Sequence, residues 1–159
     1  MLAAALLAAV VLAVGCGGAD RSADPGATST APPASTAPIV DDEARSLLST
    51  LADAEAGDEE IRAALARITA AGDERFAAPL IELLWARDIG VLADGLDYLD
   101  YIAALEALTG AGVGTNRHEW VEWYGGTEIE PPPGFTGWKG RLMSPIDLQF
   151  AEFLADGQP

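Results

Sequence analysis

The feature that most constrains the fold of this chain is an internal repeat of helical character. "IRAALARITAAG" begins at Ile61, and the similar string "YIAALEALTGAG" begins forty positions later, at Tyr101. In each copy the apolar residues recur at helical spacing, which places them on one face of a helix. Because both apolar faces have to be buried, a period near forty predicts stacked helical hairpins. The shared residues are Ala63, Ala64, Leu65, Thr69, Ala71 and Gly72, which recur as Ala103, Ala104, Leu105, Thr109, Ala111 and Gly112.

The same periodicity continues through most of the chain after Ile39, and no alternating strand pattern of useful length interrupts it. Aspartate or asparagine precedes several of the apolar stretches, as is typical of helix N-caps. The sequence therefore predicts an all-α fold over residues 41–126. The expected helices begin at Asp41 or Asp42, at Asp58, near Ala77 or Ala78 because Pro79 suits a first turn, near Val91 (running to Thr109), and after Asn116.

Two of these stretches resemble a known repeat. "GDERFAAPLIELL", from Gly72 to Leu84, resembles the first helix of a bacterial HEAT repeat, and "AALEALTG", from Ala103 to Gly110, resembles the second. The resemblance implies a short HEAT- or armadillo-like stack of helical hairpins. An ordinary alanine-rich helix pair is the alternative, because alanine is common throughout this chain.

A lone cysteine, Cys16, follows a continuously apolar run from Met1 to Val14. Fourteen helical residues rise only about 21 Å, which is less than the roughly 30 Å bilayer core and typical of a secretory signal. The residues Ala13, Val14, Gly15 and Cys16 resemble the lipobox of bacterial lipoproteins. The resemblance implies a signal peptide over residues 1–15 and a diacylglycerol on the Cys16 thiol. Ala13 replaces the usual leucine and no basic residue precedes the run, so an ordinary signal peptide or a buried helix stays open as an alternative.

Residues 16–40 are expected to form a disordered linker. The stretch from Gly17 to Pro38 contains no aromatic or large aliphatic side chain, so it buries too little surface to offset the entropy of ordering. Its prolines favour extended polyproline II. The order of signal, lipid site and spacer predicts a protein attached to the membrane through its N-terminal lipid, on the extracytoplasmic face.

Composition excludes several classes of function. The formal net charge is -16, and a body this acidic repels phosphate backbones, so nucleic acid is not an expected partner. A single cysteine and a single histidine leave no Cys-rich zinc site and no Cys-His pair. We therefore expect no cofactor and no enzymatic activity in this chain.

Residues 127–159 are expected to be an irregular Pro/Gly-rich connector, rigid at Pro131 to Pro133, followed by a short helix from Asp147 to Leu154. "EWVEWYGG", "EPPPGFTGWKGRL" and "IDLQFAEFL" together resemble the N-terminal part of a family of bacterial envelope proteins, in which a HEAT-like region precedes a domain of unknown function. The family has no established activity, so the resemblance implies no catalytic residues, and the helical body itself is expected to serve as a protein-interaction or scaffold module. The resemblance also leaves open that the chain is an N-terminal fragment whose site lies in a further domain. Four apolar residues of the connector are expected to pack back on the helical body: Phe135, Trp138, Leu142 and Met143.

The remaining candidate sites are aromatic or acidic. Four tryptophans are candidates for a groove that binds a peptide or a glycan, although such residues more often staple a small core. His118, four residues before Glu122, is more plausible as a surface or capping histidine than as a ligand. Asp94, Asp97 and Asp100 share a helical face, which converges poorly on a calcium ion. The four groove candidates are Trp85, Trp120, Trp123 and Trp138.

Overall fold

The computed structural model describes residues 34–92 and 96–146 of the chain. The chain divides into two units. The first unit, Met1–Ala31, contains Cys16 and lies outside the described residues. The helix expected from Asp147 to Leu154 also lies outside them. Every described residue belongs to the second unit, which is all-α and has no strand in its described part. Its elements are α1 (Asp41–Leu51), α2 (Asp58–Ala71), the 3-10 turn η1 (Glu74–Phe76), α3 (Ala77–Asp88), α4 (Tyr98–Thr109), α5 (Arg117–Gly125) and α6 (Phe135–Met143).

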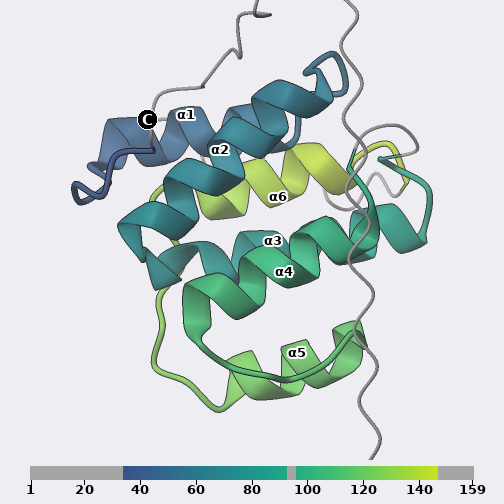
Figure 1. Ribbon diagram of the computed structural model, residues 1–159. Helices are drawn as coiled ribbons and strands as arrows, with labels where there is room; N and C mark the ends of the chain where they lie inside the picture. The colour runs from purple at the N-terminus through teal and green to yellow at the C-terminus, as the bar shows by residue number, and fades with distance from the viewer. Residues whose placement is uncertain (1–33, 93–95, 147–159) are drawn as a thin grey trace, which may run out of the picture. The chain divides into compact units, whose positions relative to one another are not determined.

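The helices form a stack in two layers. Helix α2 packs against both α1 and α4, and α4 packs against α3, so the hairpins α1–α2 and α3–α4 lie side by side (Figure 1). Helix α6 contacts both α1 and α3, and it lies between them behind the α2–α4 layer (Figure 1). Helix α5 packs on α3 at the other end of the stack. The predicted all-α stack is confirmed.

Helix α3 is the centre of the core because it is apolar around most of its circumference. A helix that is hydrophobic on all sides is buried by its neighbours, and α3 is covered by α4, α5 and α6. The helix begins at Ala77, as predicted from the position of Pro79, since a proline in the first turn lacks only an N–H that has no helical partner. Its buried residues are Ala77, Ala78, Pro79, Leu80, Ile81, Leu83, Leu84 and Ala86.

The internal repeat has the same register in the structure as in the sequence. Both copies bury the residues at their first, fourth, fifth and eighth positions. Each copy also places a threonine hydroxyl where it donates to the carbonyl four residues earlier: Thr69 to Leu65 (2.9 Å) and Thr109 to Leu105 (2.8 Å). The two helices are therefore equivalent members of two hairpins. The equivalent buried pairs are Ile61 and Tyr101, Ala64 and Ala104, Leu65 and Leu105, and Ile68 and Leu108.

The two copies end differently, although both end at a glycine in the left-handed region. Gly72 (φ 62°) follows α2, and Gly110 (φ 66°) follows α4, which ends at Thr109 as predicted and therefore two residues earlier in the repeat than α2. An L side chain rarely adopts such a φ, so glycine is favoured at both positions. Helix α4 also begins later than expected, at Tyr98 rather than near Val91, because Asp97 and Asp100 form a capping box at its start.

The expectation of an irregular segment after residue 127 is wrong for its central part. Helix α6 begins after Gly134, and Trp138, Leu142 and Met143 are buried, as expected for residues that pack back on the body. Lys139 Nζ also lies 2.7 Å from Glu82 Oε1 on α3. Helix α6 therefore shares the core of the other helices, as expected of a connector whose apolar residues pack back on the body.

Tyr101 gives this core a predictable dependence on pH. Its ring is buried, and burial raises the pKa of Tyr101 above the ordinary tyrosine value of about 10. Because the folded state binds this proton more tightly than the unfolded state, the free energy of unfolding is unaffected by Tyr101 below that value and falls as pH rises above it. Urea unfolding between about pH 8 and pH 11 should show a shallower decline for Tyr101→Phe than for the wild type.

The matched comparison for this prediction is Tyr124→Phe, because Tyr124 is only partly buried and desolvation is also what raises its pKa. We expect this variant to flatten the decline less than Tyr101→Phe does. Equal pH profiles for the wild type and Tyr101→Phe would contradict the assignment of the alkaline effect to the buried ring.

Candidate functional site

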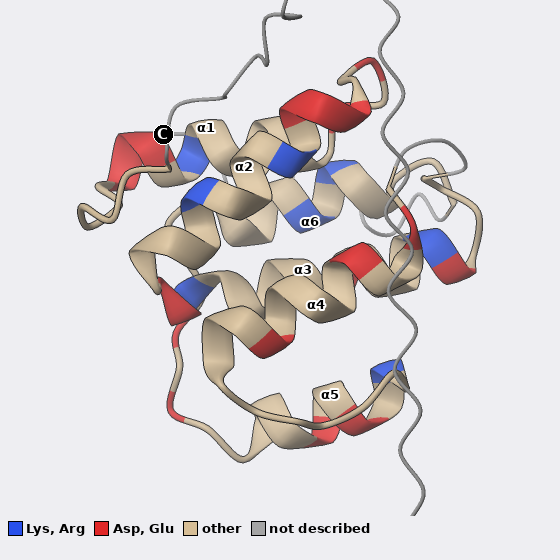
Figure 2. Ribbon diagram, in the orientation of Figure 1, with Lys and Arg blue, Asp and Glu red and all other residues tan. Residues whose placement is uncertain are grey.

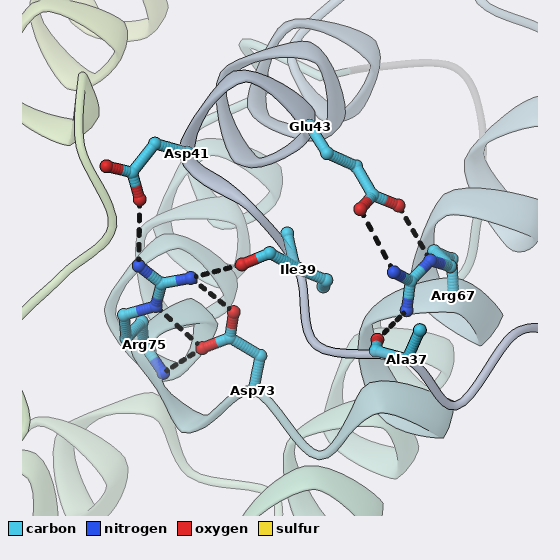
Figure 3. A network of polar contacts seen from close by, with 7 residues as sticks. All are labelled: Ala37, Ile39, Asp41, Glu43, Arg67, Asp73 and Arg75. Atoms are coloured by element: carbon cyan, nitrogen blue, oxygen red, sulfur yellow. Dashed lines mark hydrogen bonds and ion pairs between the residues drawn. The ribbon is translucent and has the colours of Figure 1, made fainter.

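A network of polar contacts lies where the segment before α1 meets α2 and η1 (Figure 3). We call residues 35–39 the strap. Arg67, on α2, donates from Nη1 to the carbonyl oxygens of Ser35 (2.9 Å) and Ala37 (3.0 Å). The other edge of the same guanidinium binds Glu43 of α1 in a bidentate pair, at 2.7 and 3.0 Å. Arg67 thus joins the strap, α1 and α2.

Arg75, on η1, makes a second junction of the same kind (Figure 3). Its Nη2 donates to the carbonyl of Ile39 at 2.9 Å, while Asp73 binds its Nε and Nη2 at 2.9 and 2.8 Å. Asp41 of α1 accepts from Nη1 at 3.3 Å. The hydrogen bonds with Asp73, reinforced by the charges of Asp73 and Asp41, raise the pKa of Arg75 above its ordinary value. The Arg75 guanidinium therefore stays positively charged, and its Nε, Nη1 and Nη2 groups all donate hydrogen bonds.

Ile39 inserts its side chain into the core, with 5% of its surface exposed, whereas residues 34–38 are exposed. The disordered linker expected over residues 16–40 therefore ends earlier than predicted, because residues 35–39 are held on the body. These residues are ordered because the Ile39 side chain is buried and because Arg67 and Arg75 donate hydrogen bonds to the backbone carbonyls. The sequence signal for this buried residue was present, since Ile39 is the first large aliphatic residue after the spacer.

The four tryptophans predicted as a groove do not form one. Trp120 and Trp138 are buried, with 0% and 1% of their surfaces exposed, so neither presents a face on which a ligand can stack. Trp120 Nε1 donates to the carbonyl of Gly114 at 2.7 Å, which fixes the loop before α5. Trp138 stacks on Phe135, with ring centroids 5.8 Å apart. These two residues are structural, as the alternative interpretation of the sequence stated.

The other two groove candidates are partly exposed and lie with different partners. Trp123 packs edge-on against Trp120, with centroids 5.6 Å apart. Trp85, on α3, lies beneath the guanidinium of Arg117 on α5, at 5.3 Å from the ring centroid. This cation–π contact helps to attach α5 to α3 and covers one face of the indole ring.

The histidine and the aspartates weighed as ligands have structural roles where they are described. His118 Nε2 lies 3.4 Å from Glu122 Oε1, and both side chains are largely exposed. Asp97 and Asp100 cap α4, while Asp94 lies outside the described residues. Within residues 34–92 and 96–146, no three histidine, cysteine or acidic residues are grouped so that they could hold a metal ion.

A pocket of about 280 Å³ opens between the end of α1, the residues after α3, and α6. Val91, Leu92, Trp138 and Leu142 give it apolar walls, and Asp53 and Arg141 add one charge of each sign. Ser49 supplies a hydroxyl, but the lining contains no histidine or lysine that would activate it. The pocket is therefore a small surface hollow without a nucleophile and base pair.

Acidic residues dominate the surface of the body. Figure 2 shows aspartate and glutamate at the starts of α1 and α2 and along α5, with the basic residues set among them. Several of these basic residues are paired with carboxylates, as Arg45 is with Asp42 and Arg62 with Asp58. A surface of this charge does not attract the anionic headgroups of a membrane.

Comparison of the chain with known protein families, with curated proteins and with solved structures finds no match. In the part of the chain that the structure describes, no helix is both long enough and apolar enough to cross a bilayer. The junction that Arg67 and Arg75 make with the strap is the candidate site that the geometry supports best.

Proposed function

We propose that this chain is a lipoprotein whose helical body is held on the extracytoplasmic face of a bacterial membrane and acts there as a protein-interaction or scaffold module. The observation that carries the proposal is the sequence order: fourteen apolar residues, then Ala-Val-Gly-Cys, then a spacer rich in Pro, Ser and Thr. The Cys16 thiol carries the lipid, and residues 1–15 are removed. Each CH₂ group of the lipid that enters the bilayer contributes about 0.8 kcal/mol to attachment.

The body supports this proposal through its charge and its N-terminal junction. With a formal net charge of -16, the chain is repelled by anionic lipid headgroups, so attachment has to come from a covalent anchor rather than from the protein surface. The strap then joins the spacer to α1 and α2 through Arg67 and Arg75. A helical stack joined to a spacer in this way suits a module that presents its outer helix faces to a protein partner.

The test is metabolic labelling with an alkyne analogue of palmitate in a bacterial host. Wild-type protein should incorporate the label and sediment with membranes, and its mature N-terminus should be a modified Cys16. The Cys16→Ser variant should lose the label and the membrane association, because no other cysteine exists in the chain. Ser22→Ala, a similarly small change in the spacer, is the matched control and should behave as wild type.

Two results would overturn the lipid anchor. One is label that survives Cys16→Ser, and the other is a purified product that retains residues 1–15 with a free thiol. The alternative that the chain is a fragment of a larger envelope protein makes a separate prediction, namely a reading frame that continues for several hundred codons past Pro159.

A further inference from the structure

The pocket between the end of α1, the residues after α3 and the end of α6 has the dimensions of a site for a small ligand. We call it the α1/α6 pocket. Leu142 in its lining is buried, while Val91 and Leu92 are partly buried and pack against the core. Its volume of about 280 Å³ is close to the lower end of the range for ligand sites, about 300 to 1,000 Å³. A single amino acid therefore suits it better than a peptide.

Hydrogen bonds fix two parts of this lining. The amides of Val91 and Leu92 both donate to the carbonyl of Ala86, at 2.8 and 3.3 Å. On the opposite wall, Asp53 Oδ1 accepts from the amide of Glu55 at 2.9 Å, which holds the carboxylate in place beyond the end of α1. These groups are therefore ordered before a ligand binds, and preorganisation of this kind lowers the entropic cost of association.

The pocket carries one charge of each sign, and the two charges do not neutralise each other. Arg141 and Asp53 both line it, but these two described side chains form no ion pair. Within residues 34–92 and 96–146, every other basic side chain has a carboxylate, carbonyl or aromatic partner, whereas the Arg141 guanidinium has none. In a chain with a net charge of -16, this cation is thus available to a ligand.

The same lining contains a second donor without a partner. Trp138 is 1% exposed, and no group among the described residues accepts a hydrogen bond from its indole Nε1. A buried N–H normally has an acceptor. A carboxylate bound in the pocket is an acceptor of the kind that this donor lacks.

We propose that the α1/α6 pocket binds a small apolar α-amino acid in its zwitterionic form. Arg141 binds the carboxylate, Asp53 binds the ammonium group, and the apolar walls receive the side chain. Each exposed charge pair contributes little alone, so binding depends on both charges and the apolar group together, with a Kd on the order of millimolar. The proposal concerns a second activity of the body and does not depend on the lipid anchor.

The test follows the binding of L-leucine by NMR of the backbone amide and indole N–H signals. It uses the chain without lipid, produced from residue 16 onward, which contains the whole second unit. L-leucine should shift the indole signal of Trp138 and the amide signals of Val91 and Leu92 saturably. Glycine keeps both charges but has no side chain to bury, so it should bind about tenfold more weakly or less.

Two blocked forms of leucine separate the contributions of the two charges. N-acetyl-leucine keeps only the carboxylate and leucinamide keeps only the ammonium group, so each should bind about threefold more weakly than leucine. Arg141→Gln should weaken leucine and N-acetyl-leucine without weakening leucinamide. Asp53→Asn should weaken leucine and leucinamide without weakening N-acetyl-leucine, and asparagine keeps an oxygen for the Glu55 amide. Both side chains are exposed, so both variants should fold.

Arg62→Gln is the matched control, because Arg62 is an exposed arginine of α2 that does not line the pocket, and this variant should bind leucine as wild type does. Absence of saturable shifts with L-leucine would overturn the proposal. So would equal binding of glycine or of either blocked form, or unchanged binding of leucine by Arg141→Gln. The comparison of ligands on the wild type decides the question even where a variant does not fold.

Discussion

Replacement of Trp138 by alanine is expected to lower the free energy of unfolding by about 3–5 kcal/mol, the range for deleting a fully buried large aromatic side chain. Trp138 is 1% exposed and lies on α6, the helix that fills the space between α1 and α3. Its ring also stacks on Phe135. Within the described residues the indole Nε1 has no hydrogen-bond partner, so the expected loss comes from apolar contact and the cavity that is left.

Urea unfolding followed by circular dichroism measures this effect. Trp123→Ala is the matched control, because Trp123 is only partly buried and its edge-on contact with Trp120 accounts for about 0.5–1.5 kcal/mol beyond its buried area. Trp138→Ala should therefore cost clearly more than Trp123→Ala. A loss below about 1 kcal/mol for Trp138→Ala would contradict the position of α6 within the core, since so small a loss is typical of a surface site.

Truncation of the equivalent leucines in the two repeats is expected to have the second largest effect. Leu65→Ala and Leu105→Ala should each lower the free energy of unfolding by about 2–5 kcal/mol, because both side chains are buried at the same position of the repeat. Leu105 should cost more, since it is fully buried on α4, which packs against both α2 and α3. The measurement is again urea unfolding.

Ala63→Ser and Ala103→Ser are the matched controls for these variants. Both alanines occupy one equivalent position on the exposed faces of α2 and α4, so each change should stay within about 0.5 kcal/mol. A destabilisation confined to one leucine of the pair would contradict the conclusion that the two helices are equivalent, and would point to a repeat in sequence alone.

The helices and the repeat register were predictable because periodicity reports directly which face of a helix is buried. Ile61, Leu65 and Ile68 in one copy, with Leu105 and Leu108 in the other, follow the spacing of a single helical face. Aspartate and asparagine also marked true starts: Asn116 Oδ1 accepts from the amide of His118 at the beginning of α5. Helix faces and helix N-caps can therefore be predicted from the sequence without knowledge of the tertiary structure.

Helix α6 was not predictable because its helical propensity is weak. Gly137 and Gly140 lie inside it, and each interior glycine disfavours a helix by about 1 kcal/mol relative to alanine. Packing outweighs this cost: both glycines are buried, as are Trp138, Leu142 and Met143. The apolar spacing of the segment was visible in the sequence. Whether it forms a helix, however, depends on the space between α1 and α3, which only the tertiary structure defines.

The candidate site could be predicted only in part from the sequence, for a different reason. Nothing in the sequence indicates that Arg67 and Arg75 bind carbonyls some thirty residues earlier, since an arginine in an acidic chain has many possible partners. The tryptophan groove failed because aromatic residues suit both a core and a binding surface, and sequence spacing does not separate the two. The assignment of Cys16 as a lipid-attachment site, in contrast, depends on local sequence alone and stays a prediction.

The contact of α1 with α6 also has a consequence for the order of events during biosynthesis. These helices lie roughly ninety residues apart in the chain. Helix α1 is therefore synthesised early, but its contact with α6 forms only late. A nascent polypeptide cannot complete this body until Met143 has emerged from the ribosome. Until then, α1 can pack against α2 but lacks the contact with α6 that completes the core.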